Sequence, residues 1–62
     1  MKKYFITVKL EDGHIYHNET LIFELSYEEL QKEQIFNKIQ KELERIGATH
    51  LKIIDIIDMK AL

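Results

Sequence analysis

The sequence contains no cysteine, no proline and no tryptophan, and it has only two glycines among its 62 residues. Without cysteine the chain has no disulfide, no thiolate metal site and no thiol nucleophile, and its composition does not favour an oxidising compartment. No apolar run approaches the length that spans a membrane, and the N-terminal residues do not resemble a signal peptide. We therefore predict a cytoplasmic protein without membrane contact, held together by hydrophobic burial alone.

The sequence also lacks an excess of charge of one sign. Its net charge is −2 at pH 7, and acidic residues are interspersed with lysines. Such a mixture gives no electrostatic reason to bind nucleic acid and provides no basic patch for lipid. A chain of this length forms one domain and buries only about 60% of the surface that the unfolded chain exposes. We expect a single domain over residues 1–62, of marginal stability, that a second chain would stabilise.

The clearest pattern in the chain is an amphipathic helix between Lys32 and Gly47. Its apolar residues recur every three or four positions, within an arc roughly 100° wide. These residues are Ile35, Phe36, Ile39, Leu43 and Ile46. Gly47 is expected to end the helix because glycine enters the left-handed conformation without steric cost, and Arg45 suits the negative end of the helix dipole.

A capping box precedes this helix. Ser26 and Glu29 have the spacing in which the serine oxygen accepts a free amide and the glutamate reaches back to the cap amide. Tyr27 and Leu30, however, project from a different side than the apolar stripe. One alternative is a short turn followed by a break near Lys32, with Leu30 tucked under the helix. The other is one straight helix with Tyr27 and Leu30 exposed. We favour the break.

The N-terminal stretch predicts a central strand. Residues 3–10 alternate in polarity and are rich in β-branched and aromatic types. Phe5 makes the second face partly apolar, which suits a central strand better than an edge. A hairpin should follow, because Asp12-Gly13 is typical of a type I′ turn.

A tight turn at Asp12-Gly13 would place Glu19 beside Ile6 in the core without a partner. We therefore expect an interruption, for which there are two alternatives. One is a bulge at residues 17–19, and the other is a loop over residues 11–19 followed by a strand over residues 20–25. Both alternatives direct the same side chains to the helix: Leu21, Phe23 and Leu25.

The isoleucine-rich stretch at residues 50–60 predicts a third strand, although neither of its faces is uniformly apolar. A strand, a helix and a second strand of these lengths form a crossover, which joins parallel strands. With the first strand in the centre, the strand order is 2-1-3, the split βαβ arrangement. We predict a small α+β fold with a single-layer sheet, element order ββαβ, and one amphipathic helix packed on one face.

The polar residues do not predict a catalytic, cofactor or metal site. His14 and His17 have a spacing seen in metal sites, but residues three apart on a strand point to opposite faces. Asp55 and Asp58 fail as a carboxylate pair for the same reason, and one of them near an edge would discourage aggregation. The order of strands and helix resembles that of the small tautomerases, whose catalytic base is a proline, but this chain has no proline. We predict that the protein is not an enzyme.

The surplus feature of the sequence is apolar surface, because the predicted helix covers only one face of the sheet. Exposed apolar patches mark association surfaces. We therefore predict a protein–protein interaction module that binds a protein partner or a second copy, with a homodimer favoured. The predicted contact residues are Phe5, Ile22, Ile54 and Ile56 on the open face, with Tyr27 and Leu30 as further candidates.

Two other functions are compatible with the sequence. One is a small enzyme or ligand-binding protein that works only as an oligomer, with a site between chains built from His14, Tyr16 or His17. The other is an acidic decoy or inhibitor of a nucleic-acid-binding protein, and the lysines between its acidic residues argue against it. The residues of such a decoy would be Glu28, Glu29, Glu33, Glu42 and Glu44.

Overall fold

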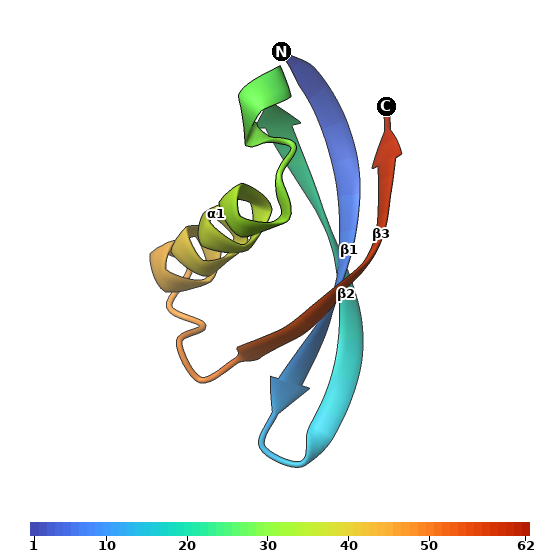
Figure 1. The fold of residues 1–62 in the computed structure, drawn as a ribbon. Helices are drawn as coiled ribbons and strands as arrows, with labels where there is room; N and C mark the ends of the chain where they lie inside the picture. Colours follow the sequence, from blue (N-terminus) through green and yellow to red (C-terminus); the bar gives the residue numbers. More distant parts are fainter.

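The computed structural model describes residues 1–62 and shows a three-stranded sheet with a helix on one face (Figure 1). The elements are β1 (Lys2–Asp12), β2 (Ile15–Leu25), a 3-10 turn η1 (Tyr27–Glu29), α1 (Lys32–Arg45) and β3 (Lys52–Ala61). The strand order is β2-β1-β3, and both neighbours pair antiparallel to β1, so β2 and β3 run in the same direction. The predicted α+β fold, its central first strand and its 2-1-3 order are confirmed. No helix has the length and apolar character needed to cross a membrane.

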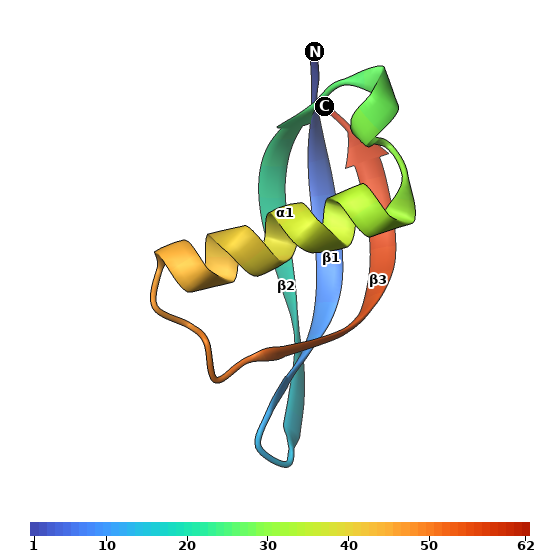
Figure 2. The same cartoon turned by 60° about the vertical axis from the view of Figure 1, so that its left-hand side comes forward.

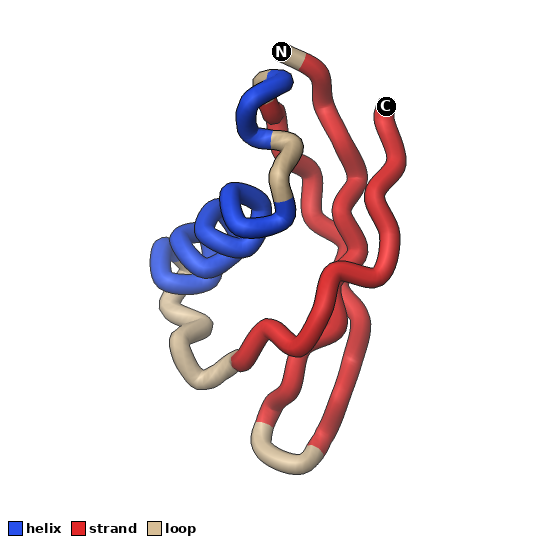
Figure 3. The backbone as a smooth tube through the Cα atoms, in the orientation of Figure 1, coloured by secondary structure: helices blue, strands red, loops and turns tan.

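The core lies between α1 and the face of the sheet that it covers. α1 crosses the strands rather than running along them, and the sheet twists strongly beneath it (Figures 2 and 3). The buried side chains come from β1, from the end of β2 and from α1. They are Ile6, Val8, Leu10, Leu25, Ile35, Ile39 and Leu43. Leu21 and Phe23 pack against this cluster, which confirms their predicted orientation toward the helix together with that of Leu25.

The hairpin between β1 and β2 differs from the prediction. The two strands pair without interruption from Lys2–Leu25 to Asp12–Ile15, so neither the predicted bulge nor the predicted long loop is present. The loop consists of Gly13 and His14, and only Gly13 has a positive φ, +65°. Positive φ at the first central residue alone is the pattern of a type II′ turn. The turn is therefore centred one residue later than a type I′ turn on Asp12-Gly13.

This shift of the turn also changes the neighbours of Glu19. Glu19 pairs with Val8, and Leu21 occupies the position opposite Ile6. The Glu19 side chain lies on the covered side of the sheet but remains 54% exposed, with its Oε1 3.5 Å from Nε2 of His17. Because β2 is an edge strand, the carboxylate stays hydrated there. The desolvation that led us to expect an interruption does not occur.

β3 contains two irregularities that the sequence reading did not predict. The pairing with β1 shifts between Thr7 and Val8, and again between Lys9 and Leu10. Each shift inserts one extra residue into β3, as in a β-bulge. The residues without a partner on β1 are Ile54 and Ile57. The other residues of β3 alternate regularly. As a result Ile53, Ile56 and Met59 lie on the covered face, opposite Leu10, Val8 and Ile6 respectively.

The two ends of the helical region agree with the sequence reading. The turn η1 is separated from α1 by Leu30 and Gln31, and Leu30 packs against the core, so the predicted break is confirmed. At the other end, Gly47 has φ +78°. The amide of Gly47 donates to Glu44 O at 3.1 Å and that of Ala48 donates to Leu43 O at 2.8 Å. These two bonds form a Schellman motif, which stops the helix just before Gly47.

Candidate functional site

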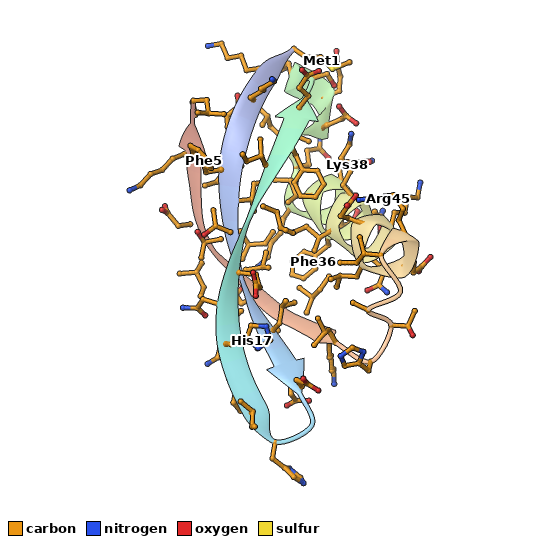
Figure 4. The ribbon with its side chains drawn as sticks, turned by 180° about the vertical axis from the view of Figure 1, so that it is seen from behind. Met1, Phe5, His17, Phe36, Lys38 and Arg45 are labelled. Carbon is orange, nitrogen blue, oxygen red and sulfur yellow. The ribbon has the colours of Figure 1, made fainter.

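The face of the sheet that points away from α1 is open, and β1 supplies its central row. Phe5, Thr7 and Lys9 alternate with the buried residues of β1 and so point to this face. Figure 4 shows Phe5 directed away from α1. The neighbours of these residues on β2 and β3 share the same face. They are Ile22 and Lys60 beside Phe5, Thr20 and Asp58 beside Thr7, and Asn18 beside Lys9. Asp55 also pairs with Lys9, but its Oδ1 lies 3.6 Å from Nζ of Lys32 on α1.

The apolar part of this face centres on a cross-strand pair. Phe5 and Ile22 lie directly opposite each other and are 37% and 59% exposed. The two bulge residues of β3, Ile54 and Ile57, are also exposed and are not part of the core cluster. We refer to Phe5, Ile22, Ile54 and Ile57 as the apolar surface set. The sequence analysis predicted three of its members as contact residues of the open face: Phe5, Ile22 and Ile54.

Ile56 does not belong to this face, which corrects the sequence prediction. It lies opposite Val8 and packs against the core cluster beneath α1. Strict alternation along β3 would place Ile54 and Ile56 on the same side. The two bulge residues, Ile54 and Ile57, break that alternation. A partner could not reach the Ile56 side chain from the open face.

Of the two further contact candidates, Tyr27 and Leu30, only Tyr27 is exposed. Leu30 is half-buried and packs against the core, so it is not an exposed contact residue. Tyr27 is 87% exposed on η1. It borders a shallow hollow whose other lining residues are mostly apolar, among them Met1, Tyr4 and Leu25.

The polar residues of the open face interact with one another. The hydroxyls of Thr7 and Thr20 are 3.0 Å apart and share a hydrogen bond. Nζ of Lys9 lies 4.9 Å from the ring centroid of Tyr16, within the range of a cation–π interaction. A hydrogen bond to the Glu11 carboxylate, together with its negative charge, raises the pKa of the Tyr16 phenol. These contacts link side chains of β1 and β2 across the open face.

The structure separates the histidines. His14 is in the hairpin loop, His17 is on the covered side of β2 beside Glu19, and Tyr16 points to the opposite side. The structure brings together no group of three or more His, Cys, Asp or Glu side chains that could hold a metal ion.

Asp55 has a local role at the edge of β3, because its Oδ1 accepts a hydrogen bond from the amide of Ile56 at 2.8 Å.

The acidic residues of the helical region are engaged within the chain. Oε2 of Glu29 lies 2.8 Å from Nζ of Lys38, and its Oε1 accepts the backbone amide of Ser26 at 2.9 Å. The Lys38 ammonium and the Ser26 amide lower the pKa of Glu29 to about 2. Arg45 pairs with Glu42, which lowers the pKa of that carboxyl group and raises that of the guanidinium. These pairs reduce the free negative charge that an acidic decoy would need.

No protein-family model matches this chain, and no curated protein or solved structure matches it either. The functional argument therefore rests on the geometry of the chain itself.

Ile57 is the member of the apolar surface set that the sequence reading missed. A signal for it is present in the sequence, since residues 53–58 repeat the triplet Ile-Ile-Asp. A regular strand cannot keep a three-residue period on one face, because its side chains alternate every two residues. One bulge in each triplet restores a common face for Ile53 and Ile56 and leaves Ile54 and Ile57 exposed.

Proposed function

We propose that this protein is a non-catalytic protein–protein interaction module whose open sheet face binds a second copy of the chain. The observation that carries the proposal is the position of the Phe5–Ile22 pair. It lies on a face that no other element of the chain covers, and the exposed bulge residues of β3 lie farther along the same sheet, at the level of residues 7–10 of β1. Apolar side chains grouped on an uncovered sheet face are typical of association surfaces.

The charges around the apolar surface set support contact between identical faces. Lys9 and Lys60 lie on this face together with Asp58, whereas Oδ1 of Asp55 is turned to the edge of β3, 3.6 Å from Nζ of Lys32 on α1. A two-fold interface brings the same patch of both subunits together, so each charge must meet a complementary one. A face that carries both signs satisfies this requirement, whereas a face of one sign would repel its copy.

The test compares the wild type with the double variant Phe5→Thr and Ile22→Thr. Threonine keeps the β propensity of both strands but removes the apolar contact area. At about 50 μM, the wild type should sediment as a dimer and the variant as a monomer with an unchanged far-UV circular dichroism spectrum. Ile15→Thr is the matched control. Ile15 is exposed on β2, as Ile22 is, but it lies next to the hairpin loop and away from the Phe5–Ile22 pair.

A wild type that is monomeric at this concentration would refute self-association through the open face. A double variant that remains dimeric would show that the dimer contact lies on another surface. The cytoplasmic location stays a prediction that rests on the cysteine-free composition.

A further inference from the structure

The two edges of the sheet differ in how they are protected. β3 carries two bulges and the charged residues Lys52, Asp55, Asp58 and Lys60, and bulges and charges are the usual means of blocking an edge. Asp55 also occupies the Ile56 amide. β2 carries two carboxylates, Glu19 and Glu24, but it pairs with β1 in one register over its whole length and contains no lysine, arginine, proline or bulge. The edge of β2 is therefore open to a further strand.

The hydrogen-bonding groups on this edge can be assigned from the register. The carbonyl of Lys3 accepts the amide of Leu62 at 2.9 Å, so the odd-numbered residues of β1 direct their backbone groups to β3. The even-numbered residues direct theirs to β2, because the groups of an antiparallel strand alternate. Their partners include Glu19 and Leu21, and the intervening residues of β2 therefore point their amides and carbonyls outward. These intervening residues are Tyr16, Asn18, Thr20, Ile22 and Glu24.

The helix provides a cover for a strand at this edge. A helix of 14 residues is about 21 Å long, whereas the outer axes of three strands lie only about 10 Å apart. Because α1 crosses the strands, its C-terminal end extends past β2 (Figure 2). Ile46 belongs to the apolar stripe of α1 but is 57% exposed at this end. It has no strand beneath it to pack against.

A hollow of about 210 Å³ lies under this end of the helix. Leu21, Leu43, Ile46 and Leu51 form its walls together with Leu10, and Glu19 is its one polar lining residue. A strand added beside β2 would point alternate side chains to the covered face, toward this hollow. We refer to the outer edge of β2 and this hollow together as the edge site.

We infer that the edge site binds an extended peptide segment of a partner protein, which adds a fourth strand to the sheet and inserts an apolar side chain beneath Ile46. Strand addition of this kind takes affinity from main-chain hydrogen bonds and specificity from pockets for alternate side chains. The site is separate from the open face, because Phe5 and the Ile22 side chain point away from the hollow.

The charge of the edge site indicates a basic segment. β2 has no basic residue apart from histidine, and both of its acidic residues, Glu19 and Glu24, are exposed. Glu24 points to the open face, whereas Glu19 lies on the covered face beside the hollow. A basic residue between the apolar residues of the added strand can therefore meet Glu24, and no lysine or arginine of β2 opposes it. The expected ligand has apolar residues on one face and basic residues between them.

A second copy of the chain fits this edge poorly. Two copies of β2 paired antiparallel would be related by a two-fold axis perpendicular to the sheet, which keeps both helices on the same side. Each α1 extends past its own β2, so the two helix ends would meet above the new strand pair (Figure 2). A peptide segment carries no such helix.

The test uses a blocked peptide of about eight residues in which leucine alternates with lysine and threonine. The protein should bind it with a dissociation constant at or below about 1 mM. Binding should slow the hydrogen exchange of the Asn18, Thr20 and Ile22 amides. A peptide with proline at its centre, and one with glutamate in place of lysine, should bind more weakly.

Two variants of the protein make the test specific. Thr20→Pro removes an outward amide that no ladder bond uses, so the edge strand can keep its fold while peptide binding is lost. Ile46→Asn removes the apolar cover and should weaken binding about tenfold without unfolding the protein, since Ile46 is exposed. Ile57→Asn makes the same change at an exposed site on β3 and should leave peptide binding unchanged.

Three results would overturn the inference. These are the absence of peptide binding at about 1 mM, binding that both Thr20→Pro and Ile46→Asn retain, and exchange protection confined to β3. A dimer of the free protein that Thr20→Pro abolishes would identify a second copy as the occupant and would equally overturn the peptide proposal. Loss of the dimer in the single variant Phe5→Thr, with peptide binding intact, would instead support both proposals, because Phe5 is on the central strand and not at the edge site.

Discussion

Val8 and Ile56 lie opposite each other on the covered face of the sheet, although Ile54, two residues earlier on β3, is exposed. Residues two apart on a regular strand share a face. Ile54 and Ile56 differ in exposure here because the bulges shift the pairing with β1 on both sides of Ile56. The bulges therefore decide which isoleucines of β3 contribute to folding and which remain on the surface.

This arrangement predicts that the same substitution has different effects at the two positions. Ile56→Asp should lower the free energy of unfolding by at least about 2 kcal/mol, because it places a carboxylate against the core. Ile54→Asp should change it by less than about 1 kcal/mol. Urea denaturation followed by circular dichroism measures both values. Equal effects would show that β3 pairs with β1 without the bulges.

The centre of the core is tested at Ile39. Its side chain is fully buried, so Ile39→Ala should cost about 2 to 5 kcal/mol through lost contacts and the cavity that remains. In a domain of this size such a loss largely unfolds the chain. Ile46→Ala is the control, because it removes the same atoms from an exposed position of the same stripe. A thermal melt of Ile39→Ala within a few degrees of the wild type would contradict this core.

The stop of α1 is tested at Gly47. Its φ of +78° is in the left-handed region, and no atom lies within 4 Å of the position that a Cβ would occupy. Gly47→Ala should therefore cost about 1 kcal/mol from backbone strain alone. Gly47→Asn should cost less, because asparagine tolerates this conformation better. The midpoints of urea denaturation give the order, and a reversed order would argue against the Schellman motif.

The start of the helical region is tested at Ser26. Its amide and hydroxyl both donate to the Glu29 carboxylate, at 2.9 and 3.1 Å. Ser26→Ala should cost about 1 kcal/mol, as at other N-cap positions. Thr49→Ala, a hydroxyl removed from the exposed connection before β3, provides the comparison. If both variants denature at the wild-type midpoint, the capping box does not stabilise the fold.

The Glu29–Lys38 pair predicts a dependence of stability on pH. The pKa of Glu29 lies at about 2, below its ordinary value of 4.5, so the folded state favours the ionised carboxylate. The resulting stabilisation is complete above about pH 4.5 and is lost as the pH falls toward 2. Glu29→Gln should therefore be less stable than the wild type at pH 6, and this difference should shrink between pH 4.5 and 2.

Glu28→Gln is the control for this experiment, because the structure shows no ion pair for Glu28. Its difference from the wild type should change less over the same range of pH. A Glu29→Gln difference that stays constant from pH 6 to pH 2 would show that the carboxylate is not paired in solution.

The local elements could be predicted from the sequence because their signals are local. The spacing of Ile35, Ile39 and Leu43 determines the buried side of α1, and Gly47 determines its end. The capping box and the mismatch in phase between Leu30 and the helix stripe indicated the break before α1. The strand order also followed, because short connections leave few topologies for a chain of this length.

The candidate surface could be predicted only in part. Phe5 and Ile22 lie on the open face as expected, since β1 and β2 alternate regularly. Ile56 was assigned to the wrong face because alternation was assumed through β3. Nothing in the local sequence of β2 indicated that its edge lies beneath an overhanging helix, which depends on the length of α1 relative to the width of the sheet.

The sequence by itself thus determined the type, order and approximate ends of the elements, because propensity, capping and periodicity act between residues close in the chain. The tertiary structure alone decided the centre of the hairpin turn, the hydration of Glu19 and the faces of the isoleucines in β3. Each of these depends on pairing between strands. A register is selected by the total burial of both strands against the helix, and bulges are retained where they bring more apolar side chains to the core than regular alternation would.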